Sequence, residues 1–144
     1  MGILTELVIA SPQEAEEVAR STSGEAERPH LVADDLDQAK LSTLRAIVTN
    51  QEYEDTWIDE FRFLAGNQED GPWVFSVPDA VVAGLAALPE SRLKAAAKQW
   101  GRTEEFQIDR PPQEEIEAVL KTLFDFFREA KTRKSRVLMR VAQL

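Results

Sequence analysis

The sequence predicts an α+β fold, a single domain over residues 1–144 with about five helices packed on a small mixed sheet of about four strands. Alternating apolar segments at both ends and in the middle of the chain indicate the strands. Helical apolar spacing dominates the rest, and no internal repeat or low-complexity segment divides the chain. A chain of 144 residues that is 43% hydrophobic can build one core without a disulfide or a metal.

The chain begins with a predicted strand that runs directly into a helix. Residues 5–10 alternate and are rich in β-branched side chains, which is typical of a strand. Ser11 then suits the N-cap, Pro12 the first helical position and Glu14 the second half of a capping box. The apolar face of this helix comprises Ala15, Val18 and Ala19.

A polar loop and a second helix follow. Residues 21–30 are small, polar and interrupted by glycine and proline, so they predict a loop. Residues 34–50 predict a helix that Asp34 or Asp35 caps at its start and Asn50 closes at its end. Its core-facing positions are Leu41, Leu44, Ile47 and Val48.

The middle of the chain predicts a β-hairpin. Residues 51–59 are acidic and indicate a loop or a short helical turn, whereas 60–65 and 72–77 alternate as strands do. The intervening residues 66–71 hold two glycines, Asn and Asp, the usual turn formers. Trp73 and Phe75 are expected on one sheet face, with Val74 and Ser76 on the other.

This hairpin turn also supplies candidate binding residues. Glu69, Asp70 and Trp73 gather within the stretch NQEDGPWVFSVPDA, where two acids lie next to an aromatic ring. A turn that feeds a strand explains the same residues, because Gly66 and Gly71 supply unusual backbone angles and Pro72 suits a strand start. Both interpretations remain open at this point.

Three further helices and a last strand complete the predicted fold. Residues 78–88, 90–101 and 113–132 have helical apolar spacing, and 135–142 alternate as a strand. The predicted core includes Trp73, Trp100, Phe124 and Phe127. The core face predicted for the long helix comprises Ile116, Val119, Leu120, Leu123, Phe124, Phe127 and Ala130.

The connector over residues 103–112 carries a second pair of candidate binding residues. Glu104 and Glu105 lie between Trp100 and Phe106 outside the long helices, so they can line a groove. Capping of a short turn by Thr103 is the alternative explanation.

The charge of the chain is unevenly distributed. The net charge is −9, and residues 1–60 hold fourteen acids against four bases. One basic cluster comprises Arg128, Lys131, Arg133, Lys134, Arg136 and Arg140. Cations are common at the end of a helix, and duplex binding requires a broader basic face. We therefore expect no nucleic-acid binding, and an acidic surface that suits a basic protein partner.

Several chemistries lack their residues in this sequence. There is no cysteine, which excludes disulfides, thiolate nucleophiles and cysteine-based zinc sites and favours a cytoplasmic location. His30 is the only histidine, and no glycine-rich phosphate-binding motif occurs. We expect no bound metal or organic cofactor. No apolar stretch approaches the ~20 residues of a membrane span, and the first residues lack a signal peptide's basic start, so no membrane association is expected.

Four segments together resemble the YfbM-like family of small bacterial proteins. They are MGILTELVIASPQEAEEVARS, LSTLRAIVTN, WVFSVPDAVVAGLAALPESRLKAAAKQW and the closing RVLMRVA. The chain departs from the family at Leu41, where members often have Trp, and at Asn50, where they have Gly. The resemblance implies a single α+β domain and transfers no catalytic residue, because the family's function is not established.

Two functional hypotheses follow. The first is a non-enzymatic, acidic cytoplasmic protein that binds a basic protein partner, as the charge distribution and the missing nucleophiles indicate. The second is a carboxylate-dependent hydrolase that Mg²⁺ could assist, because carboxylates are plentiful. A concave pocket with converging acids favours the second hypothesis, and a flat acidic face the first. The sequence leaves the oligomeric state open.

Overall fold

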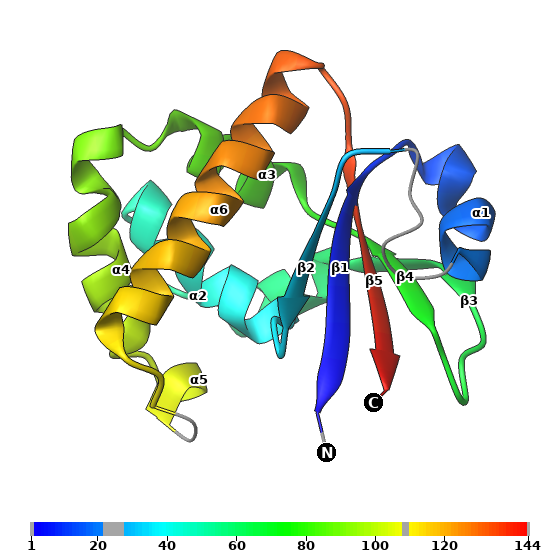
Figure 1. The fold of residues 1–144 in the computed structure, drawn as a ribbon, viewed down its shortest axis with the longest axis horizontal. Coiled ribbons are helices and arrows are strands. Elements are labelled where there is room, and N and C mark those ends of the chain that lie inside the picture. Colours follow the sequence, from blue (N-terminus) through cyan, green and yellow to red (C-terminus); the bar gives the residue numbers. More distant parts are fainter. Residues whose placement is uncertain (1, 22–27, 108–109, 144) are drawn as a thin grey trace.

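One five-stranded sheet organises the molecule (Figure 1). The computed structural model describes residues 2–21, 28–107 and 110–143. The strands are β1 (Ile3–Ile9), β2 (His30–Asp34), β3 (Arg62–Gly66), β4 (Trp73–Ser76) and β5 (Val137–Gln143). The α-helices are α1 (Ala15–Arg20), α2 (Gln38–Thr49), α3 (Asp79–Ala87), α4 (Leu93–Gly101), α5 (Glu104–Gln107) and α6 (Gln113–Thr132). Short 3₁₀ helices cover Pro12–Glu14, Asp55–Glu60 and Glu90–Arg92.

The α+β class is confirmed, and the sheet differs from the prediction in two details. Its order is β2-β1-β5-β4-β3, so it has five strands rather than about four. Every pair of neighbouring strands is antiparallel, so the predicted mixed sheet is wrong. The described residues form six α-helices, one more than predicted, because the connector contains the one-turn helix α5.

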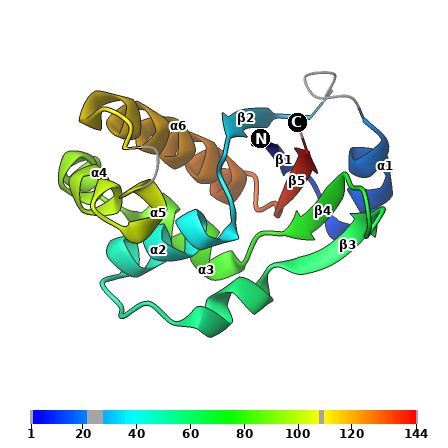
Figure 2. The same cartoon turned by 90° about the horizontal axis from the view of Figure 1, so that it is seen from below.

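Helices cover both faces of the sheet. Figures 1 and 2 show α2 to α6 on one side and α1 alone on the other. The strands β1 and β5 are central and alternate between the two cores. Leu7 and Met139 are register partners on the side of the larger core, whereas Val8 and Leu138 are partners on the side of α1. All four side chains are buried, as expected for strands that are covered on both faces.

The strand β2 was not predicted. We expected residues 21–30 to form a loop and a helix to start at Asp34 or Asp35, and both N-cap assignments are wrong. Residues 30–34 instead pair with β1, and Asp35 adopts a φ of 57°. Asp37 is the N-cap, since its Oδ1 accepts a hydrogen bond from the Lys40 amide at 2.8 Å. Residues 22–27 of the predicted loop lie outside the described residues.

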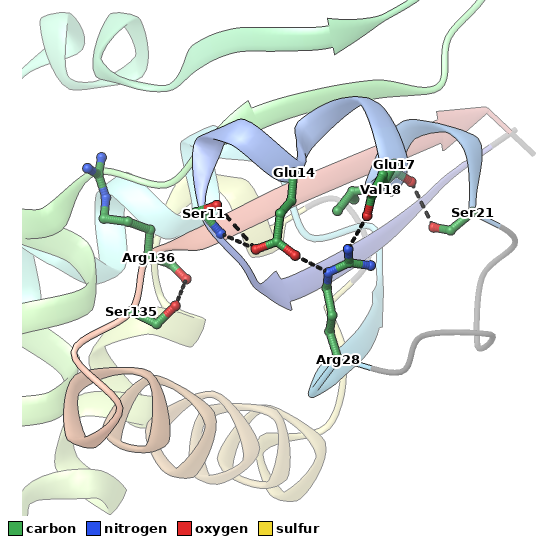
Figure 3. Close-up of polar contacts among 8 residues, drawn as sticks. All are labelled: Ser11, Glu14, Glu17, Val18, Ser21, Arg28, Ser135 and Arg136. Carbon is green, nitrogen blue, oxygen red and sulfur yellow. Dashed lines mark hydrogen bonds and ion pairs between the residues drawn. The ribbon is translucent and has the colours of Figure 1, made fainter.

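The helix α1 is held to the start of β2 by one arginine (Figure 3). The predicted capping box is present, and the Ser11 amide donates to Glu14 Oε1 at 3.0 Å. Arg28 Nε donates to the other oxygen of Glu14 at 2.7 Å, and its Nη2 pairs with Glu17. The hydrogen bonds from Ser11 and then Arg28 lower the pKa of Glu14. Their stabilising contribution is therefore present near neutral pH and is lost as the pH falls below the usual glutamate range.

The acidic segment before the hairpin forms a 3₁₀ helix over Asp55–Glu60. Its anchor is Trp57, which is buried and lies 3.9 Å below the guanidinium of Arg45. Arg45 also pairs with Glu60 at 3.1 Å, so this short helix is fastened to α2 at both its centre and its end.

The predicted hairpin is confirmed, since β3 and β4 pair on either side of the turn. Its first strand starts at Arg62 and not at residue 60, because Glu60 ends the 3₁₀ helix. A bulge between Phe63 and Ala65 shifts the register, so Phe63 stays on the face of Phe75 while Ala65 joins the α1 side. Trp73 and Phe75 do share the face of the larger core. Trp73 is only half-buried at its periphery, which corrects its predicted place in the core.

Most of the other predicted core positions are confirmed. Trp100, Phe124 and Phe127 are fully buried. Asn50 ends α2 in the left-handed conformation with a φ of 55°. The exception on the long helix is Val119, whose side of α6 opens to solvent. Val119 instead lines a groove beside α6.

We expect Gly66→Ala to destabilise the fold by about 1–3 kcal/mol or more. Gly66 has a φ of +109°, and an added Cβ would collide with the backbone carbonyl oxygen of Pro72. Gln68→Ala in the same turn is the matched control, because Gln68 is exposed and its side chain makes no hydrogen bond to the described residues. Urea denaturation measures both variants, and a Gly66→Ala protein as stable as the Gln68→Ala control would contradict the prediction.

Candidate functional site

A groove of about 510 Å³ lies between the edge strand β2 and the helix α6. Figure 2 shows β2 at one margin of the sheet with α6 on the helical side of that margin. The apolar residues that line it include Leu31 and Ala33 of β2, Trp100 of α4, Phe106 of α5, Pro111, and Ile116 and Leu123 of α6. The groove therefore combines a sheet edge, an apolar inner wall and an open side.

The inner wall is rigid because its aromatic residues are anchored. Trp100 is fully buried, and its Nε1 donates to the Lys40 carbonyl oxygen at 2.9 Å. The Phe106 ring meets Trp100 edge-on with centroids 4.9 Å apart, and Lys40 Nζ lies 4.9 Å from the Phe106 centroid. This chain of contacts joins α2, α4 and α5 behind the groove. A wall of this kind is preorganised to receive an apolar group.

The rim of the groove carries more acid than base. Asp34, Asp35 and Glu115 line it, and Lys40 is the cation among the described lining residues. Lys40 Nζ donates to the Asp35 carbonyl oxygen at 2.9 Å, which fixes the ammonium group beside the end of β2. Asp35 Oδ1 accepts from the Ile3 amide at 3.2 Å. Three carboxylates against one ammonium give the rim a negative potential that favours cationic groups.

Two exposed valines face solvent on opposite sides of the groove. Val32 of β2 is 44% exposed, and Val119 of α6 is 37% exposed. Val119 extends the apolar surface of the wall to the mouth of the groove, whereas strand alternation places the Val32 side chain on the other side of β2. Exposed apolar surface with a polar rim is typical of an interaction site.

The candidate residues in the hairpin turn lie away from this groove. Glu69 and Asp70 are exposed, and their amides donate to Asn67 Oδ1 at 2.9 and 3.3 Å. Trp73 Nε1 donates to the Gln68 carbonyl oxygen at 3.1 Å. The turn thus satisfies its own polar groups, which supports its interpretation as a structural turn.

The second pair of candidates is adjacent to the groove without lining it. Glu104 and Glu105 begin α5, and the next residue, Phe106, belongs to the groove wall. Glu105 is half-buried, and its charge acts on Tyr53, whose pKa is raised by burial first and then by Asp55 and Glu105. Figures 1 and 2 show α5 and the β3–β4 hairpin at opposite ends of the molecule, so the structure does not bring the two pairs together.

The groove residues Val32, Asp34, Asp35, Glu115 and Val119 were not predicted as site residues. In the sequence, helix capping explains Asp34 and Asp35, and burial in the core explains Val119. None of the three therefore indicates a binding site before the structure is known. A helical wheel places Val119 beside Ile116 and Leu120, and nothing in it separates a groove from a core.

The described residues contain no group of three or more histidines, aspartates or glutamates placed to hold a metal ion. None of their helices has the length and apolar character that crossing a membrane requires.

The groove is thus the concave apolar surface around which a function can be argued, and its rim adds an excess of carboxylates. Comparison of the chain with protein-family models, with curated proteins and with solved structures finds no match.

Proposed function

We propose that this is a non-enzymatic binding protein that holds a basic, partly apolar segment of a partner protein in the groove between β2 and α6. The supporting observation is the combination of a buried aromatic wall with a rim of three carboxylates in one concavity. The apolar wall contributes affinity by removing apolar surface from water, and the rim selects a cationic partner.

The charge of the whole chain supports the same choice of partner. The net charge of −9 attracts a basic partner before contact, and the rim then directs its cations to Asp34, Asp35 and Glu115. This attraction is screened by salt, so binding is expected to weaken as the ionic strength rises.

A carboxylate-dependent hydrolase is the second candidate, because the three acids do line one concavity. Catalysis by paired acids requires surroundings that separate the pKa values of the two carboxyl groups. Asp34, Asp35 and Glu115 are all exposed, so their surroundings do not differ in burial. The binding function fits the observed exposure better.

The test is an NMR titration with a short synthetic peptide of alternating lysine and valine. We expect it to shift the amide signals of groove residues, whereas a peptide with glutamate in place of lysine does not. The double variant Asp34→Asn with Glu115→Gln is expected to weaken lysine-peptide binding about three- to tenfold, the range for two exposed charge pairs.

The matched control removes the same number of charges elsewhere. Glu69→Gln with Asp70→Asn lies in the hairpin turn, outside the groove lining, and should leave the affinity unchanged. A loss of binding in this variant alone would place the site in the turn, and no binding of either peptide would overturn the proposed function. Amide shifts at residues 34, 35 and 115 on addition of Mg²⁺ would instead favour the hydrolase.

We also propose membership of the YfbM-like family, on the four quoted segments. The cytoplasmic location and the absence of nucleic-acid binding stay predictions from composition and charge.

A further inference from the structure

We propose that the partner segment binds by strand addition, in an extended conformation, along the outer edge of β2. This inference rests on the proposed function and specifies how the groove recognises its ligand. The bound segment becomes a sixth strand whose backbone pairs with β2 while alternate side chains enter the groove.

The pairing of β2 with β1 shows which backbone groups face outward. The Ile9 amide donates to the Pro29 carbonyl at 3.0 Å, and the Asp35 amide donates to the Ile3 carbonyl at 3.2 Å. Within an antiparallel pair, hydrogen-bonded positions alternate with positions whose N–H and C=O point away. The N–H and C=O groups of Leu31 and Ala33 therefore point toward β1.

The intervening residues His30, Val32 and Asp34 present their N–H and C=O to the open edge. Among the described residues, β2 has no second neighbouring strand to bond these backbone groups.

The two edges of the sheet differ in how well they are protected. The other edge strand, β3, contains a bulge between Phe63 and Ala65, and bulges hinder pairing with another chain. The register of β2 is regular over its five residues, and Val32 at its centre is 44% exposed. Of the two edge strands, β2 is therefore the one that can pair with a further strand.

The alternation of β2 predicts the pattern of the ligand. Leu31 and Ala33 pack on the side of the larger core, and the Val32 side chain lies on the opposite side of the strand. Asp34, the last residue of β2, lies on the rim of the groove. Ligand side chains beside Leu31 and Ala33 would point to α6, where Val119 is exposed, and should be apolar. Those beside Asp34 should be basic, because opposite charges across a strand pair are favourable. A segment of alternating apolar and basic residues meets both demands.

A second copy of this chain is a poor occupant of the same edge. Each chain carries a net charge of −9, so two copies repel each other. An antiparallel pair of β2 strands centred on Val32 would place Asp34 of each copy opposite His30, and β2 offers no lysine or arginine to pair with it. The edge therefore suits a basic partner of a different sequence.

Amide hydrogen exchange with the lysine–valine peptide tests the pairing directly. At a peptide concentration ten times its Kd, we expect exchange of the His30, Val32 and Asp34 amides to slow about tenfold, because only the unbound fraction exchanges. The amides of Leu31 and Ala33 already bond to β1 and should keep their rates. Binding through side chains alone would leave all five rates unchanged and would overturn strand addition.

Two variants of Val32 complete the experiment. Val32→Pro removes the outward N–H, and proline is tolerated where an edge-strand N–H faces solvent, so we expect at least tenfold weaker peptide binding. Val32→Thr keeps the N–H and the branched shape and should bind normally. Unchanged exchange of the β1 and β5 amides checks that the proline variant is folded. If the proline variant is unfolded, the exchange rates of the unaltered protein alone decide whether the peptide binds by strand addition.

The outcomes separate this inference from the proposed function. If the Asp34→Asn, Glu115→Gln protein loses affinity while Val32→Pro binds normally, the groove binds the peptide without strand addition. If neither peptide binds, the proposed function fails as well. Protection of Val32 that rises with protein concentration in the absence of peptide would assign the edge to a second copy and overturn the choice of partner.

Discussion

Replacing Phe124 by alanine is expected to lower the free energy of unfolding by about 3–5 kcal/mol. Phe124 is 1% exposed and lies in the middle of α6, where it belongs to the larger core. Truncation removes the ring from that core and leaves a cavity that the surrounding helices and sheet can fill only in part. Lys121 and Arg128 lie 5.2 and 5.0 Å from the ring centroid and would lose that contact too.

Urea denaturation followed by circular dichroism measures this loss. Val119→Ala on the same helix is the control, because Val119 is 37% exposed and alanine has the higher helix propensity. Its stability should stay within about 0.5 kcal/mol of the unaltered protein. A loss below about 1 kcal/mol for Phe124→Ala would show that this face of α6 is not packed as the structure has it.

Replacing Trp100 by alanine is expected to cost a similar amount, about 3–5 kcal/mol, and to impair the groove as well. Trp100 is fully buried in α4, and its Nε1 hydrogen bond reaches Lys40, 60 positions earlier in the chain. Its loss would leave Phe106 without its edge-on partner and would widen the groove on its inner side. Peptide binding should therefore weaken together with stability.

A conservative variant separates the two contributions of Trp100. Trp100→Phe keeps an aromatic ring in the core and loses the hydrogen bond, for which we expect a cost of about 1 kcal/mol. The cost is limited because the Lys40 carbonyl oxygen also accepts from Thr43 Oγ1 at 3.0 Å. Equal losses for the alanine and phenylalanine variants in thermal or urea melts would show that the hydrogen bond, and not the packing, is what matters.

Local physical chemistry in the sequence determined the central elements of the fold. The strands at both ends of the chain contain continuous apolar runs, residues 7–9 and 137–139, because both of their faces are buried. The long helix places Phe124 and Phe127 on one face through its period of 3.6 residues. The capping box at Ser11, the left-handed Asn50 and the glycine-bounded hairpin turn each act over a few residues. Such signals need no information from distant segments, so they can be identified in the sequence alone.

The tertiary structure alone decided the edge strand and the groove. The five residues of β2 have too short a pattern to compete with the capping signals beside them, and they become a strand because β1 offers its free edge. The groove combines residues of β2, α4, α5 and α6, which meet only when the helices pack on the sheet. Val119 has the spacing of a core residue, but no element of the described chain covers its side of the helix, so it remains exposed. Periodicity determines which face of an element is apolar, whereas the packing of distant elements determines which part of that face is left open to bind a partner.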